Sequence, residues 1–191
     1  METKRKNFDK RFKLHAACRL HEAHPDQAYI SFRDGFAYAS NGSLTVKARL
    51  EYIADFNPQE LAILEGKSIH MDNFKRLLNY RVANVTERGF MVNDQGKRVL
   101  IYFNDQMEIS FTTEVNDFLE RILLTDNIVS VHRVGIRASQ IRIAQAVIGS
   151  DNLKADFYDG GDGRIVTHLC EYTENGFPFI GVFIFDNLID K

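Results

Sequence analysis

The chain of 191 residues is long enough for one large or two small domains, and it can bury a substantial core without disulfides or metals. Hydrophobic residues make up 45% of the chain and charged residues 26%, a composition that excludes disordered and fibrous proteins. The formal net charge of −2 is close to neutral, so the molecule as a whole has no positive field that would attract nucleic acid.

The first thirteen residues are strongly basic. Against Glu2 and Asp9 stand six cations, namely Lys4, Arg5, Lys6, Lys10, Arg11 and Lys13. Such a run of positive charge is able to contact phosphate groups. It is equally typical of a solvated chain end, so both interpretations remain open.

The stretch HAACRLHEAH places four metal-ligating side chains at steps of three: His15, Cys18, His21 and His24. Imidazole and thiolate groups are good zinc ligands. Steps of three drift by about 60° each on a helix, and they alternate between the two faces of a strand. The four side chains are therefore not expected to converge, and we expect no metal and no cofactor. Residues 11–20 are predicted to be a strand, followed by a polar loop.

Residues 28–50 are predicted to form three antiparallel strands. The fifteen Phe and seven Tyr of the chain favour β-structure, and apolar and polar residues alternate in AYISFRDG and LTVKARL, with FAYAS between them. Gly35 marks the first turn. Asn41-Gly42 marks the second, since Asn-Gly between alternating runs is a strong hairpin signal.

The same pattern returns in residues 82–103. Gly35-Phe36 aligns with Gly89-Phe90, and the Gly of the second turn aligns with Gly96. VANVTERG, FMVND and RVLIYF are therefore predicted to be three further strands.

A short strand and a helix are expected before them, in residues 68–81. Phe74, Leu77 and Leu78 are spaced at i, i+3 and i+4, which places them on one face of a helix. Asp72 is the expected N-cap. Three polar residues fall on the opposite face: Lys75, Arg76 and Asn79.

Residues 113–127 are predicted to be a linker helix, because their apolar residues recur at helical spacing. A third copy of the pattern follows in VGIRASQIRIAQAVIGS, which gives a strand and a helix with Ser139 as candidate N-cap. The apolar face of that helix is expected to hold Ile141, Ala144 and Ile148. LKADFYDG, GRIVTHL and FPFIGVFIF are predicted to be its three strands, and the Gly- and Asp-rich YDGGDG between the first two a hairpin turn.

Each copy thus consists of a strand, a helix and three antiparallel strands, which predicts an α+β fold with an internal repeat. The first copy leaves almost no room for its helix. One such unit has an apolar sheet face that it cannot bury alone, so two units are expected to pair about a pseudo-two-fold axis.

The compartment is expected to be the cytoplasm. Cys18 and Cys170 are too few for a disulfide framework, and the N-terminal stretch lacks the apolar segment of a secretory signal. The longest apolar run, FIGVFIF at 179–185, is too short to span a bilayer, so no membrane association is expected.

A paired strand–helix–three-strand unit resembles the half-domain of DNA sliding clamps, the processivity rings of replicative polymerases. Two passages carry the resemblance: YASNGSLTVKARL, with its Ala39-Ser40-Asn41-Gly42-Ser43 turn, and GIRASQIRIAQAVIGSDNLKADFYDGGDGRIVTHL. The similarity covers most of residues 11–186. It implies a clamp-like domain over residues 1–112, with half-units at about 11–50 and 66–112. The linker helix at 113–127 and a third half-unit at 128–191 would follow.

The resemblance also implies a function. Clamps do no chemistry, so the chain is expected not to be an enzyme and to have no catalytic residues. Their helices line a hole and meet the DNA backbone loosely, without reading sequence. The residues that match are Lys75, Arg76, Asn79, Arg142 and Gln145, to which the basic run adds Lys10 and Arg11. The partners implied are duplex DNA and replication or repair proteins.

Three half-units are half the number in a bacterial clamp chain and a quarter of the number in its ring. The third half-unit is therefore expected to pair with another chain, as in a homo-oligomer, or to pack on the first domain in an unusual way. Solvation alone also explains the charged helix faces. The alternative function is a clamp-fold protein-interaction module that does not encircle DNA, and a more distant one is a small hydrolase or metal protein.

Overall fold

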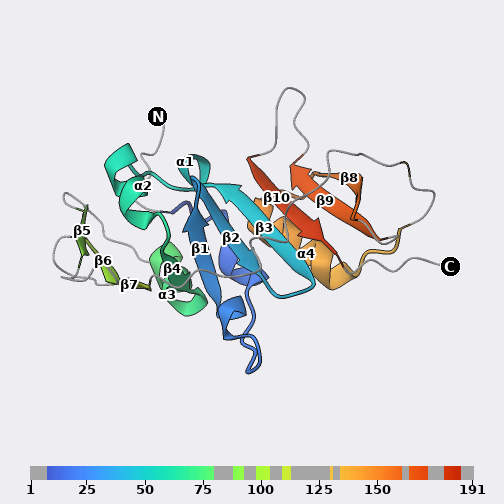
Figure 1. Cartoon of the computed structure of the whole chain (residues 1–191). Helices are drawn as coiled ribbons and strands as arrows, with labels where there is room; N and C mark the ends of the chain where they lie inside the picture. The colour runs from blue at the N-terminus through green and yellow to red at the C-terminus, as the bar shows by residue number, and fades with distance from the viewer. Residues whose placement is uncertain are drawn as a thin grey trace.

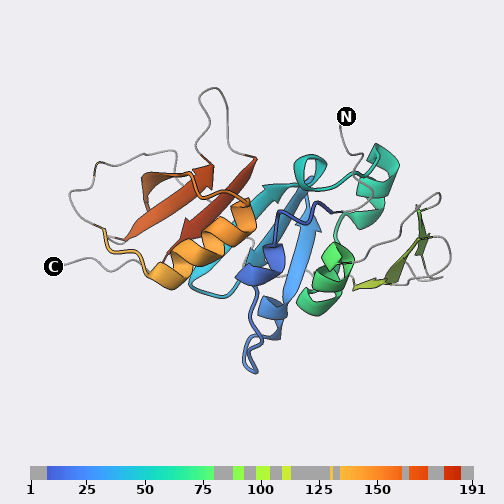
Figure 2. The same ribbon diagram turned by 180° about the vertical axis from the view of Figure 1, so that it is seen from behind.

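The structure is a computed structural model. It describes residues 8–79, 88–92, 98–103, 109–112, 130, 134–160, 164–171 and 179–185. Between residues 88 and 112 only the backbone of the strands is described. The chain has an α+β fold, in which helices cover one face of an antiparallel sheet (Figures 1 and 2). No helix in the described ranges is long and apolar enough to cross a membrane.

The ten strands among the described residues form one sheet in the order β5-β6-β7-β4-β1-β2-β3-β10-β9-β8 (Figure 1). Their bounds are Tyr29–Arg33, Phe36–Ser40, Leu44–Arg49, Ser68–His70, Arg88–Val92, Arg98–Phe103, Ile109–Thr112, Leu153–Asp159, Ile165–Glu171 and Ile180–Ile184 for β1 to β10. The first strands of the chain thus lie in the middle of the sheet, and later strands extend it on both sides.

Local turn chemistry explains the central strands. Arg33 pairs with Phe36, so Asp34 and Gly35 form a two-residue loop between β1 and β2. Both loop residues have positive φ, 52° and 75°, as a primed turn requires. The β2–β3 turn is held by the Asn41 side chain, whose Oδ1 accepts hydrogen bonds from Ser43 and from the Leu44 backbone N–H. The strands predicted in residues 28–50 are confirmed.

Long-range pairing joins the last strands to the first. β10 pairs with β3, where Val182 lies opposite Val46, and β9 and β8 follow outward. The three strands predicted after residue 150 are confirmed. On the other side β4 pairs with β1, and β7 joins β4 through Ser68 and Thr112. The third copy is therefore joined to the first within one chain, through β3 and β10.

In the described part of the chain, three helical segments cover one face of the sheet: the 3-10 helix η1 (Leu14–Ala17), α3 (Met71–Asn79) and α4 (Ala138–Ile148) (Figure 2). We call them the helix layer. The core lies between this layer and the sheet and includes Leu14, Phe74, Leu77, Ala144 and Val147 against Ile30, Phe32, Val46, Ile69 and Val182. Three shorter segments complete the described fold: η2 (Pro25–Ala28), α1 (Leu50–Ile53) and α2 (Pro58–Leu64).

The strand predicted at residues 11–20 is wrong, because η1 occupies this stretch. Leu14 and Ala17 are fully buried at a spacing of three, which matches the repeat of a 3-10 helix. The backbone N–H of Lys13 donates to the carbonyl oxygen of Ala146 at 3.1 Å, so the segment is hydrogen-bonded to α4 while it packs against the sheet. A short helical turn therefore lies where the sequence predicted a strand.

The two longer helices, α3 and α4, form where they were predicted, but the roles of some single residues differ from the prediction. Phe74, Leu77 and Leu78 are buried on α3 as predicted. Ile141 is 37% exposed, because the buried face of α4 is made by Gln140, Ala144, Val147 and Ile148. The N-cap of α4 is Arg137 instead of Ser139, and its backbone N–H donates to Gln140 Oε1 at 3.0 Å. Asp72 lies inside the first turn of α3, which begins at Met71.

The second copy agrees with the sequence in part. β6 matches the predicted RVLIYF, whereas β5 (Arg88–Val92) spans the junction between the two predicted strands before it. The prediction did not include β7, α1, α2 or η2. A strand before the third helix is not formed, since residues 134–137 hold only the bridge residue Gly135. The predicted linker helix at 113–127 lies outside the described residues.

Candidate nucleic-acid interface

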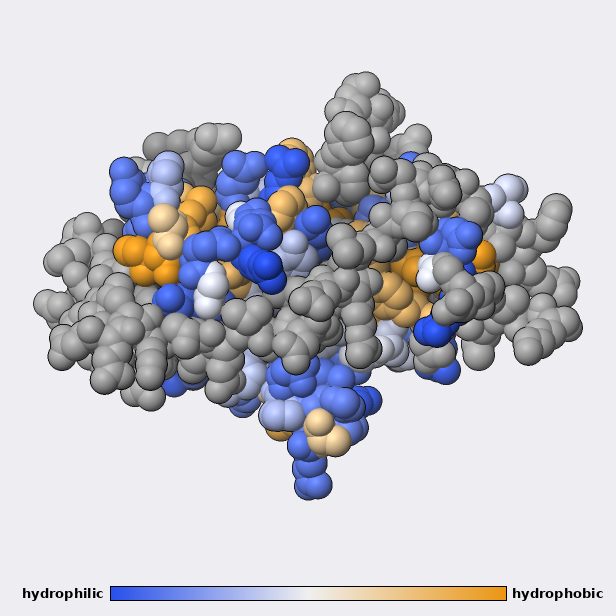
Figure 3. All heavy atoms as spheres, viewed as in Figure 1, coloured by the Kyte–Doolittle hydropathy of each residue, from blue (hydrophilic) through white to orange (hydrophobic). Residues whose placement is uncertain are grey.

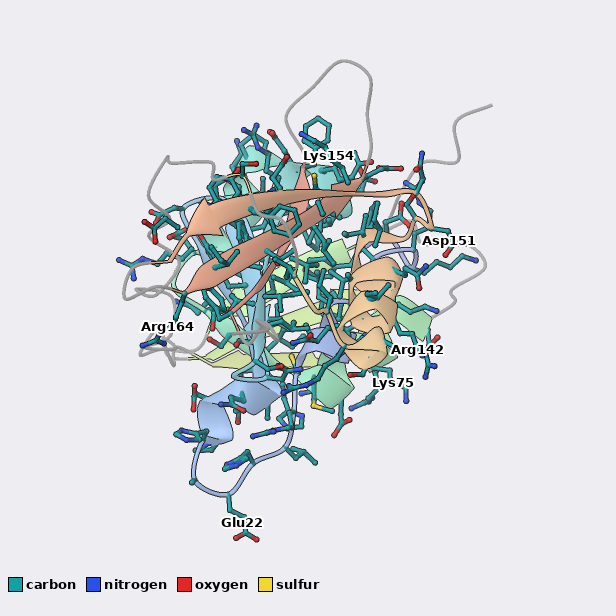
Figure 4. The ribbon with its side chains drawn as sticks, turned by 90° about the vertical axis from the view of Figure 1, so that its right-hand side faces the viewer. Glu22, Lys75, Arg142, Asp151, Lys154 and Arg164 are labelled. Carbon is teal, nitrogen blue, oxygen red and sulfur yellow. The ribbon has the colours of Figure 1, made fainter. Side chains whose placement is uncertain are left out.

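The helix layer brings together basic residues from three parts of the sequence. α4 and the segment leading into η1 are joined by the Lys13–Ala146 hydrogen bond, and η1 also contacts α3. Six cations of these segments are exposed: Lys10, Arg11, Lys13, Lys75, Arg76 and Arg142. We call these six residues the basic band. Seen edge-on, Lys75 and Arg142 lie on the same side of the sheet, that of the helices (Figure 4).

The pKa of His15 depends on the charges of the basic band. It lies in η1 and is half-buried, and its ring centroid is 6.2 Å from that of Phe74. Burial lowers the pKa of His15 below its usual 6.5, and the positive charges of Lys75 and Lys13 lower it further. Asp72 acts in the opposite direction. Cations from α3 and from the N-terminal segment thus act on the same imidazole.

Few carboxylates neutralise this band. Asp9 pairs with Arg11 at 2.7 Å, and this hydrogen bond raises the pKa of the guanidinium. Arg76 Nη1 is 3.5 Å from the Asn73 side chain. Over the described ranges, no carboxylate lies within ion-pair distance of Lys10, Lys13, Lys75 or Arg142, so these charges face solvent. Asn79 on α3 is also exposed, whereas Gln145 on α4 is half-buried.

Two described cations on the other face of the sheet, Lys47 and Arg49, already contact neighbouring side chains. Lys47 Nζ lies 4.4 Å from the centre of the Phe36 ring. Arg49 forms an ion pair with Glu51 at 3.3 Å and lies near the rings of Phe36 and Phe179. This face is polar over its middle (Figure 3), and among its described residues Arg33, Arg49 and Lys154 are each paired with an acidic side chain. The two faces of the sheet therefore differ in the charge that they offer to a polyanion.

Most of the residues that were predicted to contact DNA lie in or next to the helix layer. Lys75 and Arg142 were expected to be equivalent positions in two copies, and the structure places both on the exposed side of the helix layer. Lys10 and Arg11 lie in the segment that leads into η1, which is hydrogen-bonded to α4 through Lys13. Lys13 was named only as a member of the basic run, without a place beside the helices, and His15 was considered only as a metal ligand. Their place depends on η1, which the short apolar run in RFKLHAACRL did not reveal.

Metal-ligating side chains do not gather in the helix layer. Of the described residues, no three among His15, Cys18, His21 and His24 converge on one point, although the rings of His21 and His24 are 5.0 Å apart. Burial raises the pKa of Cys18 to about 12, and its thiol donates weakly to the Tyr29 carbonyl oxygen. One His–Cys–Asp group is present on the opposite face of the sheet, in β8 and β9.

Comparisons with known proteins identify no relative. A scan against protein-family models gave no match, and neither did searches of curated proteins and of solved structures.

Proposed function

We propose that the chain is a non-enzymatic, clamp-like accessory protein that associates with duplex DNA through its basic band. The helix layer would meet the phosphate backbone without reading base sequence. Its partners would be DNA and proteins of replication or repair, and it would work in the cytoplasm. The proposal rests on the resemblance to sliding-clamp half-domains and on the physical contrast between the two faces of the sheet.

The observation that carries the proposal is the position of the unneutralised charge. Lys75, Arg142 and Lys13 come from segments far apart in the sequence, and all three are exposed on the helix layer. Solvated helix faces usually carry cations that alternate with acids. The net charge of the whole chain is near neutral, but on the helix layer the exposed cations outnumber the acids. This distribution favours a DNA-associated protein over an interaction module that has lost its DNA-binding face.

The strength of binding follows from the size of the basic band. A protein that neutralises Z phosphates loses affinity with a slope of about −0.9Z in log K against log salt. Six band residues give a slope of at most about −5, and the pairing of Arg11 with Asp9 makes it shallower. One chain would therefore hold DNA weakly and release it readily as salt rises.

The direct test compares two triple variants of equal charge. Lys13→Gln, Lys75→Gln and Arg142→Gln remove three charges from the basic band. Arg33→Gln, Lys47→Gln and Arg49→Gln remove three charges from the opposite face and serve as the matched control. We expect the first variant to lower affinity for a short duplex by about tenfold or more at low salt and to flatten the salt slope by roughly 2 to 3. Fluorescence anisotropy at several salt concentrations measures both quantities.

Two results would reject the proposal. One is equal loss of affinity in the two variants, which would mean that net charge alone matters. The other is the absence of measurable binding by the wild-type chain at low salt. Circular dichroism and thermal melting confirm that each variant is folded before its affinity is compared.

Enclosure of DNA would require self-association, because three half-units cannot form a ring of the clamp type. We propose that several chains assemble for this purpose, and four chains would match the twelve half-units of the family's ring. Light scattering on a sizing column gives the native mass. Retention on closed circular DNA, with release after linearisation, would support enclosure. A monomer at micromolar concentration, released equally from both DNA forms, would contradict it.

A further inference from the structure

A His–Cys–Asp group lies on the sheet face that the helix layer leaves uncovered. Asp156 in β8 is directly opposite His168 in β9, and Cys170 follows two positions later on the same strand. Because side chains alternate along a strand, His168 and Cys170 share one face, while Leu169 between them points into the core. Asp156 shares that face, since directly paired residues do.

The three side chains are close enough to share a metal ion. One ligand atom from each lies within 4.8 Å of the other two. A tetrahedral zinc ion, with bonds of about 2.0–2.3 Å, holds its ligand atoms about 3.3–3.8 Å apart. Small side-chain rotations would therefore close the remaining gap without moving the strands. The set of one nitrogen, one sulfur and one oxygen ligand suits zinc and similar divalent ions.

His168 is unusual among the side chains of this face. It is 8% exposed, and its Nδ1 has no hydrogen-bond partner within the described part of the chain. The ring stacks on Phe183 with centroids 4.5 Å apart and planes 9° from parallel. An unsatisfied buried nitrogen is unfavourable unless something binds it. Phe183 and the strands hold the imidazole beside Cys170 and Asp156 without satisfying that nitrogen.

Gly181 in β10 makes room for this arrangement. It lies opposite Cys170, and a Cβ atom built at this position would overlap His168 Nε2. The absence of a side chain at Gly181 thus allows the imidazole to lie over the strand. Access from solvent remains on the side of Asp156, whose side chain is 22% exposed.

We propose that Asp156, His168 and Cys170 bind a divalent zinc-class ion, with water in the fourth position. The Cys170 thiol would release its proton to solvent as the sulfur–metal bond forms. The ion would join β9 to β8, a strand that ends the sheet. Lys154 competes for the same carboxylate, since its Nζ is 3.0 Å from Asp156 Oδ2. Metal binding would displace that ammonium group into solvent.

The test uses Co²⁺ and Zn²⁺ with the full chain under reducing conditions. Thiolate ligation of Co²⁺ produces a charge-transfer band in the near ultraviolet, and we expect one equivalent per chain. Cys170→Ser should abolish this band, whereas Cys18→Ser, which removes the other free cysteine, should leave it unchanged. Asp156→Asn, a change at a partly exposed side chain, should weaken Zn²⁺ binding by about tenfold or more.

A second variant acts in the opposite direction. Lys154→Met removes the competitor for Asp156, so we expect it to strengthen Zn²⁺ binding several-fold in calorimetric titration. The proposal is overturned if the wild-type chain gives no thiolate–cobalt band, or if the band survives Cys170→Ser. Unchanged affinity in both Asp156→Asn and Lys154→Met would remove Asp156 from the site. Thermal melting establishes that each variant is folded, and none of these outcomes depends on DNA binding.

Discussion

His15 provides a local probe of the proposed DNA contact. Burial, followed by the charges of Lys75 and Lys13, lowers the pKa of this imidazole below 6.5. Phosphates placed on the basic band would offset those charges and favour the imidazolium form. We therefore expect the pKa of His15 to rise when a short duplex binds and to return as salt displaces the DNA. Proton NMR titration of the imidazole measures the shift.

His168 is the internal control for this measurement. Its pKa is also lowered, mainly by burial, but it lies on the face of the sheet opposite the helix layer. DNA bound to the basic band should leave its titration unchanged in the metal-free chain. If both imidazoles shift together, or if neither does while DNA is bound, the band is not the binding surface.

Single residues were predictable where a local rule decides them. Phe74, Leu77 and Leu78 share a helix face by spacing alone, and they are buried. Ile141 was assigned to the wrong face because the direction in which α4 faces the sheet depends on tertiary packing, which spacing does not encode. The meeting of Asp156 and His168 depends on the β8–β9 register, so no local pattern could reveal it.

At the scale of elements, α2 illustrates a helix that begins at a well-defined cap. Asn57 Oδ1 accepts a hydrogen bond from the Glu60 backbone N–H at 2.9 Å, and Glu60 Oε2 accepts one from the Asn57 N–H at 2.8 Å. This reciprocal pair satisfies two donors at the helix start, and Pro58 occupies the first turn.

Removal of that cap should destabilise the fold measurably. We expect Asn57→Ala to lower the free energy of unfolding by about 1 kcal/mol, because the Glu60 N–H loses its acceptor. Chemical denaturation monitored by circular dichroism checks the value. Gln59→Ala, at an exposed position in the same turn, is the matched control and should change stability little. An equal effect in both variants would show that the cap contributes nothing.

η1 shows why element type was harder to predict than element position. Short apolar runs do not distinguish a strand from a helical turn by periodicity alone. RFKLHAACRL alternates at Phe12 and Leu14, which favours a strand, and only Ala17 breaks the alternation. The docking of Lys13 on Ala146 decides in favour of the turn, and that contact joins segments far apart in the sequence.

At the scale of the whole molecule, two histidines couple stability to pH. The pKa values of His15 and His168 are lowered in the folded chain, chiefly by burial. The unfolded chain therefore binds protons more readily, and its imidazoles titrate near 6.5. The stability contributed by the neutral imidazoles is present above that pH and is lost as pH falls below it.

We accordingly expect the melting temperature of the metal-free chain to fall between pH 7.5 and pH 5. His15→Gln should reduce this dependence, because Gln does not titrate, while His168 retains its share. Thermal melts at intervals of half a pH unit measure the slope for both proteins. A melting temperature that rises on acidification, or a slope unaffected by His15→Gln, would contradict this account.

The α+β class and the first and last groups of three strands could be predicted from the sequence, since alternation and turn residues determine them. The pairing of these groups into one continuous sheet could not be predicted. The local pattern of β10 predicts which of its side chains face the core, but it does not determine whether the strand pairs within the chain or with another chain. The observed partner is β3, with Val182 opposite Val46. Pairings over such separations depend on the whole core.

The central position of β1, β2 and β3 has a consequence for synthesis on the ribosome. These strands emerge before β10, and β3 pairs with β2 at once but gains its second neighbour only when β10 has been made. Until then a strand edge that includes Leu44 and Val46 remains open to other nascent chains. Chain termination before Ile180 would leave that edge permanently unpaired, so truncated products should aggregate rather than accumulate as folded fragments.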